Sequence, residues 1–136
     1  MSFFASLASL LGGASFGPEH LDQLCAEHPG TLLLDVRTRA EYVQGHIDGS
    51  TLVPLDQLSA SLTQLAAAPA PIIVICHSGA RASTAATALR RAGKADVHVL
   101  GGGVSSWGSH GRKLSPGAKD VPLRDAIKKA RQAVAT

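Results

Sequence analysis

The sequence predicts a single α/β domain with a mostly parallel sheet. Residues 31–34 and 71–75 are continuous apolar runs without polar alternation, a pattern typical of strands that are buried on both faces. Segments with apolar residues at helical spacing separate these runs from two shorter strand candidates. Strands that alternate with helices favour a parallel sheet, and 136 residues suit one domain with one core.

In the first half of the chain, Pro18 begins a short amphipathic helix, which Pro29 and Gly30 end. The first buried strand follows and ends in Asp35. A short apolar run at 51–53 predicts a second strand. The helix expected after it rests on leucines three or four residues apart, namely Leu55, Leu58, Leu62 and Leu65.

In the second half, the strand at 71–75 leads into Cys76 and then into a helix over 82–92. The apolar stripe of that helix consists of Ala82, Ala85, Ala86 and Leu89. Its basic end and Gly93 suit a helix C-terminus, where cations complement the dipole and glycine ends the helix. Residues 96–100 predict the last strand, which three glycines at 101–103 end.

The positive charge of the protein belongs to its C-terminal tail. Residues 1–110 contain six Lys and Arg against eight Asp and Glu, a balance of −2. Residues 111–136 contain seven against two, a balance of +5. A basic footprint over the globular part is therefore missing, and we expect no nucleic-acid partner.

The tail contains a candidate linker at 111–120 and an amphipathic helix after Pro122. The apolar side of this helix carries Leu123, Ala126, Ile127, Ala130 and Val134. The opposite side carries Arg124, Lys128 and Arg131. We expect the apolar side to dock on the domain or on a second copy of the chain, forming a homodimer; the alternative is a membrane surface.

The N-terminal residues and the cysteines indicate a cytoplasmic protein. The uncharged stretch at 2–17 is interrupted by Ser and Gly and is too short for a membrane span, which needs about 20 apolar residues. No Lys or Arg precedes it, as a signal peptide would require. Cys25 and Cys76 are too few for a disulfide framework and lack zinc-site spacing, so we expect no metal.

The strongest candidate for chemistry is Cys76, which lies where a buried strand ends and a helix begins. Ligands of open α/β sheets gather at this edge. The turn between strand and helix, made of His77, Ser78, Gly79, Ala80 and Arg81, can aim several backbone N–H groups at the sulfur and so favours a thiolate and a bound anion. Gly79 permits a tight turn, and Arg81 adds a positive charge. The alternative is that Cys76 is a small apolar residue of the core.

Four blocks in this order resemble the single-domain rhodanese-like sulfurtransferases over residues 15–107. They are Leu34-Asp35-Val36-Arg37 with Glu41-Tyr42, Gly45-His46-Ile47 with Gly49-Ser50, the run from Cys76 to Arg81, and Gly102-Gly103 before Trp107. The resemblance implies a rhodanese-like α/β fold with about five strands and helices on both faces. It divides the chain into an N-terminal segment at 1–14, a domain at 15–112 and the basic tail at 113–136.

The resemblance also implies the reaction. Cys76 would take sulfane sulfur from a donor such as thiosulfate, hold it as a persulfide and pass it to cyanide or a thiol, without a cofactor. His77, Ser78, Gly79, Ala80 and Arg81 would bind the substrate. Two departures leave the acceptor open: Ala82 replaces the Ser or Thr that many members have, and residues 108–112 do not follow the usual ending.

Two other functions remain open. One is a sulfur-relay or binding module that exchanges sulfur with a dedicated protein partner. The other is a phosphatase or arsenate reductase with a similar Cys-to-Arg loop. The loop from Cys76 to Arg81 has four intervening residues, whereas the phosphatases that it resembles have five, which favours sulfur over the larger phosphoryl group.

The remaining polar blocks are interpreted mainly as structural support. Asp35 ends a strand, and Arg37 and Glu41 are spaced to form an ion pair on a helix that would fix the loop beside Cys76. We expect His46 to be a hydrogen-bonded packing residue. His77 either lines the pocket or points to solvent. Two further residues are predicted to lie in the core: Trp107, and Cys25, whose alternative role is a resolving thiol.

Overall fold

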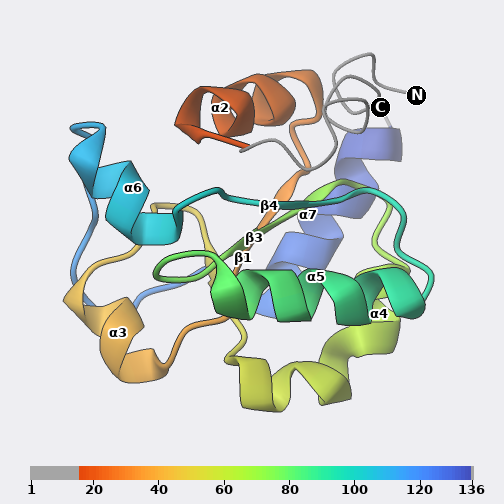
Figure 1. Ribbon diagram of the computed structural model, residues 1–136. Helices are drawn as coiled ribbons and strands as arrows, with labels where there is room; N and C mark the ends of the chain where they lie inside the picture. The colour runs from red at the N-terminus through yellow and green to blue at the C-terminus, as the bar shows by residue number, and fades with distance from the viewer. Residues whose placement is uncertain (1–15, 136) are drawn as a thin grey trace.

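The computed structural model describes residues 16–135 of the chain, so the predicted N-terminal segment lies outside the described residues. Its centre is a parallel sheet in the order β2-β1-β3-β4, with helices on both faces (Figure 1). The strands are β1 (Leu32–Asp35), β2 (Thr51–Leu52), β3 (Ile72–Ile75) and β4 (Val97–Val99). The predicted α/β class is confirmed.

The sheet has four strands instead of about five. Among the described residues, the only trace of a further neighbour beside β4 is an isolated parallel bridge between Phe16 and Leu100. A single bridge orders too few residues to count as a strand. The four strands are those that the apolar runs predict.

Seven helical segments connect and flank the strands in the described part of the chain. Their bounds are α2 (Pro18–Glu27), α3 (Arg39–Gln44), η1 (Leu55–Ser61), α4 (Leu62–Ala66), α5 (Ala80–Arg91), α6 (Gly103–Ser109) and α7 (Leu123–Ala135). The helix predicted after β2 is therefore split. Its first part is a 3-10 helix, whose repeat of three residues places Leu55 and Leu58 on the same side.

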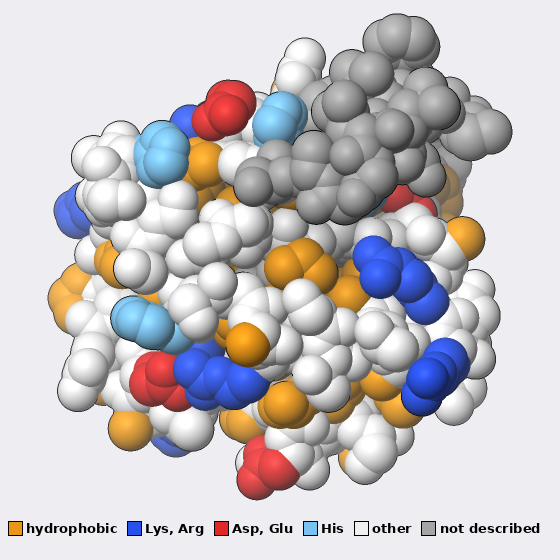
Figure 2. Space-filling model, in the orientation of Figure 1, with side chains coloured by type: hydrophobic (Ala, Val, Ile, Leu, Met, Phe, Trp, Pro, Cys, Tyr) orange, Lys and Arg blue, Asp and Glu red, His pale blue; other side chains and the backbone are white. Residues whose placement is uncertain are grey.

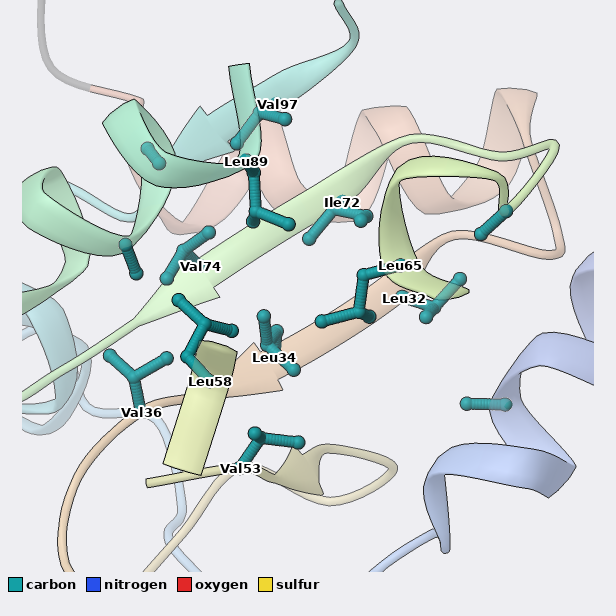
Figure 3. Close-up of a cluster of buried hydrophobic side chains, with 14 of the residues drawn as sticks. Leu32, Leu34, Val36, Val53, Leu58, Leu65, Ile72, Val74, Leu89 and Val97 are labelled. Atoms are coloured by element: carbon teal, nitrogen blue, oxygen red, sulfur yellow. The ribbon is translucent and has the colours of Figure 1, made fainter. Parts of the chain in front are cut away.

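The two faces of the sheet carry separate cores. On one face, Leu34 and Val74 pack with Leu58, Leu65 and Leu89 from η1, α4 and α5 (Figure 3). On the other face, the strand residues Ile73 and Ile75 pack with Leu24 of α2 and with Val104 and Trp107 of α6. Both sides of β3 are thus covered, which explains its continuous apolar sequence. Trp107 lies in the core, as predicted.

The tail packs against the same domain. Ala126, Ile127 and Ala130 of α7 are buried in the core formed with η1, α4 and α5. The expected docking on the domain is therefore seen. The close approach leaves no room for a side chain at Gly30, where a Cβ would lie 2.9 Å from the Cα of Ala130.

The segment before α7, which includes the candidate linker, is hydrogen-bonded to the domain. The N–H of Gly117 donates to the carbonyl of Val43 at 2.8 Å, and the carboxylate of Asp120 accepts from the N–H of Leu52 at 3.1 Å. Asp120 thereby covers part of the exposed edge of β2. Over residues 16–135, no helix has the length and apolarity needed to cross a membrane.

Candidate active site

The topology places a crevice between the C-terminal ends of β1 and β3. The two strands are neighbours, but β1 connects onward to β2 on one side and β3 connects onward to β4 on the other. Loops that leave adjacent strands in opposite directions open a crevice outside the sheet, where α/β proteins bind ligands. In Figure 1 the loop that leads into α5 lies at this end of the sheet, between α3 and α6.

Cys76 follows directly on β3, at the end of the sheet where this crevice is expected. The residue is only 1% exposed. Its Sγ accepts a hydrogen bond from the backbone N–H of Gly79 at 2.8 Å. The chain reverses so tightly because Gly79 has a φ of 116°, a conformation that side chains with a Cβ disfavour. The sulfur therefore lies inside the turn that follows it.

Four further N–H groups of the loop, those of His77, Ser78, Ala80 and Arg81, have no hydrogen-bond partner among residues 16–135. The last two belong to the first turn of α5, whose leading N–H groups have no partner within the helix. The positive end of the helix dipole adds to them. The loop that follows the sulfur thus carries several N–H donors of a kind that suits a thiolate or a bound anion.

Arg81 is paired with Glu41 of α3 across the crevice. Its guanidinium donates to both carboxylate oxygens, at 2.7 and 2.8 Å. Figure 2 shows basic and acidic side chains in contact over α3 and the start of α5, with a His beside them. Both side chains are about one-third exposed. The loop is thereby tied to the element that follows β1.

This pairing corrects the prediction that Arg37 and Glu41 pair along one helix. Arg37 precedes α3, which begins at Arg39, so helical spacing does not apply to it. Its guanidinium instead folds back onto Asp35, with distances of 2.9 to 3.2 Å, and also donates to the carbonyl of Gly45 at 2.8 Å. The Asp35–Arg37 pair is buried and braces the end of β1.

The charge on Glu41 is stabilised mainly by Arg81. The hydrogen bonds from the guanidinium lower the pKa of the Glu41 carboxyl to about 2, and bonds from Thr38 contribute less. The Thr38 side chain also accepts a hydrogen bond from the backbone N–H of Glu41, so a capping box begins α3. The hydrogen bonds with Glu41 in turn raise the pKa of Arg81. Both groups are charged throughout the neutral range.

A buried network supports α3. The ring of His46 stacks on Tyr42 with 3.9 Å between centroids, and its Nδ1 lies 3.0 Å from the carbonyl oxygen of Tyr42. The Tyr42 hydroxyl donates to the carbonyl of Ser50 at 2.9 Å. His46 is 4% exposed and is a packing residue, as predicted. It keeps α3, and with it Glu41, in place.

The second cysteine lies on the opposite face of the sheet. Cys25 of α2 packs against the core of α2 and α6, whereas Cys76 belongs to the core on the α5 side. Burial and the neighbouring Asp22 raise the pKa of the Cys25 thiol. The sheet between the two sulfurs argues against an attack of Cys25 on Cys76 within one chain. Within the described residues, no three His, Cys, Asp or Glu side chains are placed to hold a metal ion.

Sequence reasoning missed one set of contacts with the loop. The N–H groups of Val104 and Ser105, in the first turn of α6, donate to the carbonyls of Cys76 and His77 at 2.9 and 3.1 Å. The available signal was the triple glycine at 101–103, which the sequence analysis interpreted as the end of a strand and as part of the family resemblance, without predicting its contact with the loop.

Comparison with known proteins agrees with this geometry. A family model described as a rhodanese-like domain matches residues 18–110. A sulfurtransferase of Allochromatium vinosum is 32% identical over 93 residues, which cover 68% of this chain and 86% of that protein. A thiosulfate sulfurtransferase GlpE of Pseudomonas fluorescens is 34% identical over 90 residues, covering 66% and 80%. The crystal structure of a thiosulfate sulfurtransferase from Pseudomonas aeruginosa aligns with a TM-score of 0.70 and 26% identity, over 96% of this chain and 26% of that chain.

Proposed function

The chain belongs to the rhodanese-like domain family, and we propose that it transfers sulfane sulfur from thiosulfate to cyanide or a thiol through a persulfide on Cys76. The observation that carries the proposal is the sulfur of Cys76 inside a turn of backbone donors, one of which already bonds it. We propose that the donor and acceptor are small molecules of the cytoplasm. The reaction as proposed needs no cofactor.

In the first half-reaction, the Cys76 thiolate attacks the outer sulfur of thiosulfate. A new sulfur–sulfur bond forms to Cys76 while the bond to the sulfonate group breaks, and sulfite leaves with the electron pair. The N–H groups of the loop stabilise negative charge on the attacking thiolate and then on the terminal sulfur of the persulfide. Because these donors are backbone groups fixed by the fold, they need no rearrangement during the reaction.

In the second half-reaction, the acceptor attacks the terminal sulfur of the persulfide. Cyanide carbon or a thiolate forms the new bond to sulfur, and the bond to Cys76 breaks so that the Cys76 thiolate leaves with its electron pair. Thiocyanate or a new persulfide is released. The enzyme returns to its starting state with one sulfur atom transferred.

Arg81 attracts the dianionic donor to the mouth of the crevice. Its pairing with Glu41 holds the guanidinium at the rim instead of directly on the sulfur. The six-residue loop and the nearly complete burial of Cys76 favour a donor that delivers one sulfur atom over a bulky phosphate ester. The side chains of His77, Ser78 and Ala80 are exposed around the rim, where an acceptor would approach.

Intact-mass measurement after treatment with thiosulfate tests the proposal. We expect the wild type and Cys25→Ser to gain one sulfur atom, because Cys25 lies on the other face of the sheet. Cys76→Ser should gain none. A persulfide mapped to Cys25, or no gain by the wild type, would contradict the assignment.

The same protein samples separate an enzyme from a relay module. After loading with thiosulfate, the persulfide is mixed with cyanide or with a small thiol and its decay is followed by mass. Multiple turnovers with either acceptor support a sulfurtransferase for small molecules. A persulfide that forms but passes its sulfur to neither acceptor would instead indicate a relay to a protein partner.

A further inference from the structure

The turn between β4 and α6 lies against the backbone of the sulfur-bearing loop. Gly102 and Gly103 both have positive φ, at 72° and 56°. A Cβ built on Gly103 would lie 2.1 Å from the carbonyl oxygen of Cys76 and 2.6 Å from that of His77. No side chain fits at either distance, so the two backbones meet where only glycine allows it.

The first turn of α6 holds the loop by its carbonyl groups. Val104 donates its N–H to the carbonyl of Cys76, and Ser105 donates to that of His77. These N–H groups have no partner inside α6, because they belong to its first turn. The loop carbonyls satisfy them, and each carbonyl lies 28 residues earlier in the chain than the N–H group that it accepts from.

Peptide planarity transmits this hold to the other side of the loop. In a trans peptide, C=O and N–H point in opposite directions within one plane. A Cys76 carbonyl that faces α6 therefore turns the N–H of His77 away from α6, and a His77 carbonyl that faces α6 does the same for the N–H of Ser78. Both of these N–H groups have no hydrogen-bond partner among residues 16–135.

We propose that Gly103 and the first-turn N–H groups of α6 are a positioning device for the sulfur-bearing loop: they fix the Cys76 and His77 peptides so that the N–H groups of the loop face the thiolate and its bound anion. Gly103 is a positioning residue, since it acts through the loop and does not touch the sulfur. The role of this device in sulfur transfer rests on the proposed function. Its effect on the Cys76 thiolate does not.

Gly103→Ala tests the device, with Gly111→Ala as its matched control. Gly111 lies beyond the other end of α6, has a φ of 75°, and a Cβ there meets nothing within 4 Å. Both substitutions therefore strain a positive φ next to the same helix, and only Gly103→Ala drives a methyl group into the loop. Thermal unfolding of each variant measures the shared cost in stability.

Two readouts report the loop itself. The first is the rate of Cys76 alkylation by iodoacetamide against pH, with Cys25 as an internal reference in the same sample. In Gly103→Ala, we expect the midpoint of the Cys76 profile to move up by about half a pH unit or more, because the thiolate loses donors. The second is kcat/KM for thiosulfate, which should fall at least about tenfold. Gly111→Ala should leave both near the wild-type values.

Ser105→Pro covers the case in which Gly103→Ala does not fold. Proline is tolerated in the first turn of a helix, and at the exposed Ser105 it removes the N–H that donates to His77. Thermal unfolding measures its additional restriction of the Val104 backbone. We expect the same direction of change in the alkylation profile. An unchanged profile in the folded variants, or equal changes in Gly103→Ala and Gly111→Ala, would overturn the inference. Alkylation needs no sulfur donor, so a wild type inert toward thiosulfate would contradict the proposed function and leave this test intact.

Discussion

The ion pair between Glu41 and Arg81 gives a quantitative prediction about how the loop is held. Taken alone, the fall of the Glu41 pKa from 4.5 to about 2 corresponds to roughly 3 kcal/mol, at about 1.4 kcal/mol per pH unit. Both side chains are about one-third exposed, and solvent screening reduces the value of such a pair to about 1 kcal/mol. A double-mutant cycle of Glu41→Gln and Arg81→Gln, measured by urea unfolding at pH 7, should return a coupling of that size.

The pH dependence of this coupling follows from the direction of the Glu41 pKa shift. The pKa of Glu41 is lower in the folded protein, so the pair stabilises the protein at neutral pH. Its contribution begins to decrease below the ordinary pKa of 4.5 and disappears as the pH falls through about 2. A coupling below about 0.3 kcal/mol at pH 7 would refute the geometry, since that is the usual error of additivity.

The same variants separate the two residues in catalysis. Arg81→Gln removes a charged hydrogen-bond donor from the rim, and kcat/KM for thiosulfate should fall by about 10- to 100-fold. Glu41→Gln leaves the guanidinium charge in place, and its effect should stay within about threefold. The double variant should recover part of the Arg81→Gln loss, because the uncompensated Glu41 carboxylate no longer repels the dianion. Equal losses in the two single variants would refute this division of roles.

Two further predictions concern the tail and the choice between sulfur and phosphorus. Ile127 of α7 is buried, and Ile127→Ala should destabilise the protein by about 2–5 kcal/mol. Val134 is predicted to lie on the same apolar side but is exposed near the end of the helix, so Val134→Ala should change stability by less than about 0.5 kcal/mol. Similar melting temperatures of the two variants would show that α7 does not dock. The wild type should hydrolyse p-nitrophenyl phosphate negligibly. A residue inserted between Ala80 and Arg81 should weaken sulfur transfer, because it displaces the N–H donors of the loop. Phosphatase turnover by the wild type that Cys76→Ser abolishes would overturn this assignment.

The parts of the fold that sequence predicts well are those with local signals. The buried strands are visible because both faces of the sheet are covered, so their residues are apolar without interruption. The position of Cys76 at a strand end, before a turn with Gly79 and a helix, is also a property of one continuous segment. Topology then needs only the rule that parallel strands end at the same edge.

The contacts that sequence does not predict are those between distant segments. The cation at helical spacing from Glu41 is Arg37, four residues away, whereas its actual partner, Arg81, is forty residues away. The spacing favours Arg37, but Arg37 lies before the start of α3 and its guanidinium pairs with Asp35 instead. Gly103 likewise predicts only a turn from the sequence. Its contact with Cys76 exists only because β4 lies beside β3.

The site therefore depends on the backbone more than on the side chains of the loop. One side of the loop is held at its carbonyls by α6, and its far end is held at Arg81 by α3. The N–H groups left between these two attachments are the donors that the proposed chemistry uses. His77, Ser78 and Ala80 supply N–H groups whatever their side chains are, and those side chains are exposed at the rim. In the proposed reaction, backbone N–H groups therefore stabilise the charge on sulfur, and the exposed side chains at the rim select the acceptor.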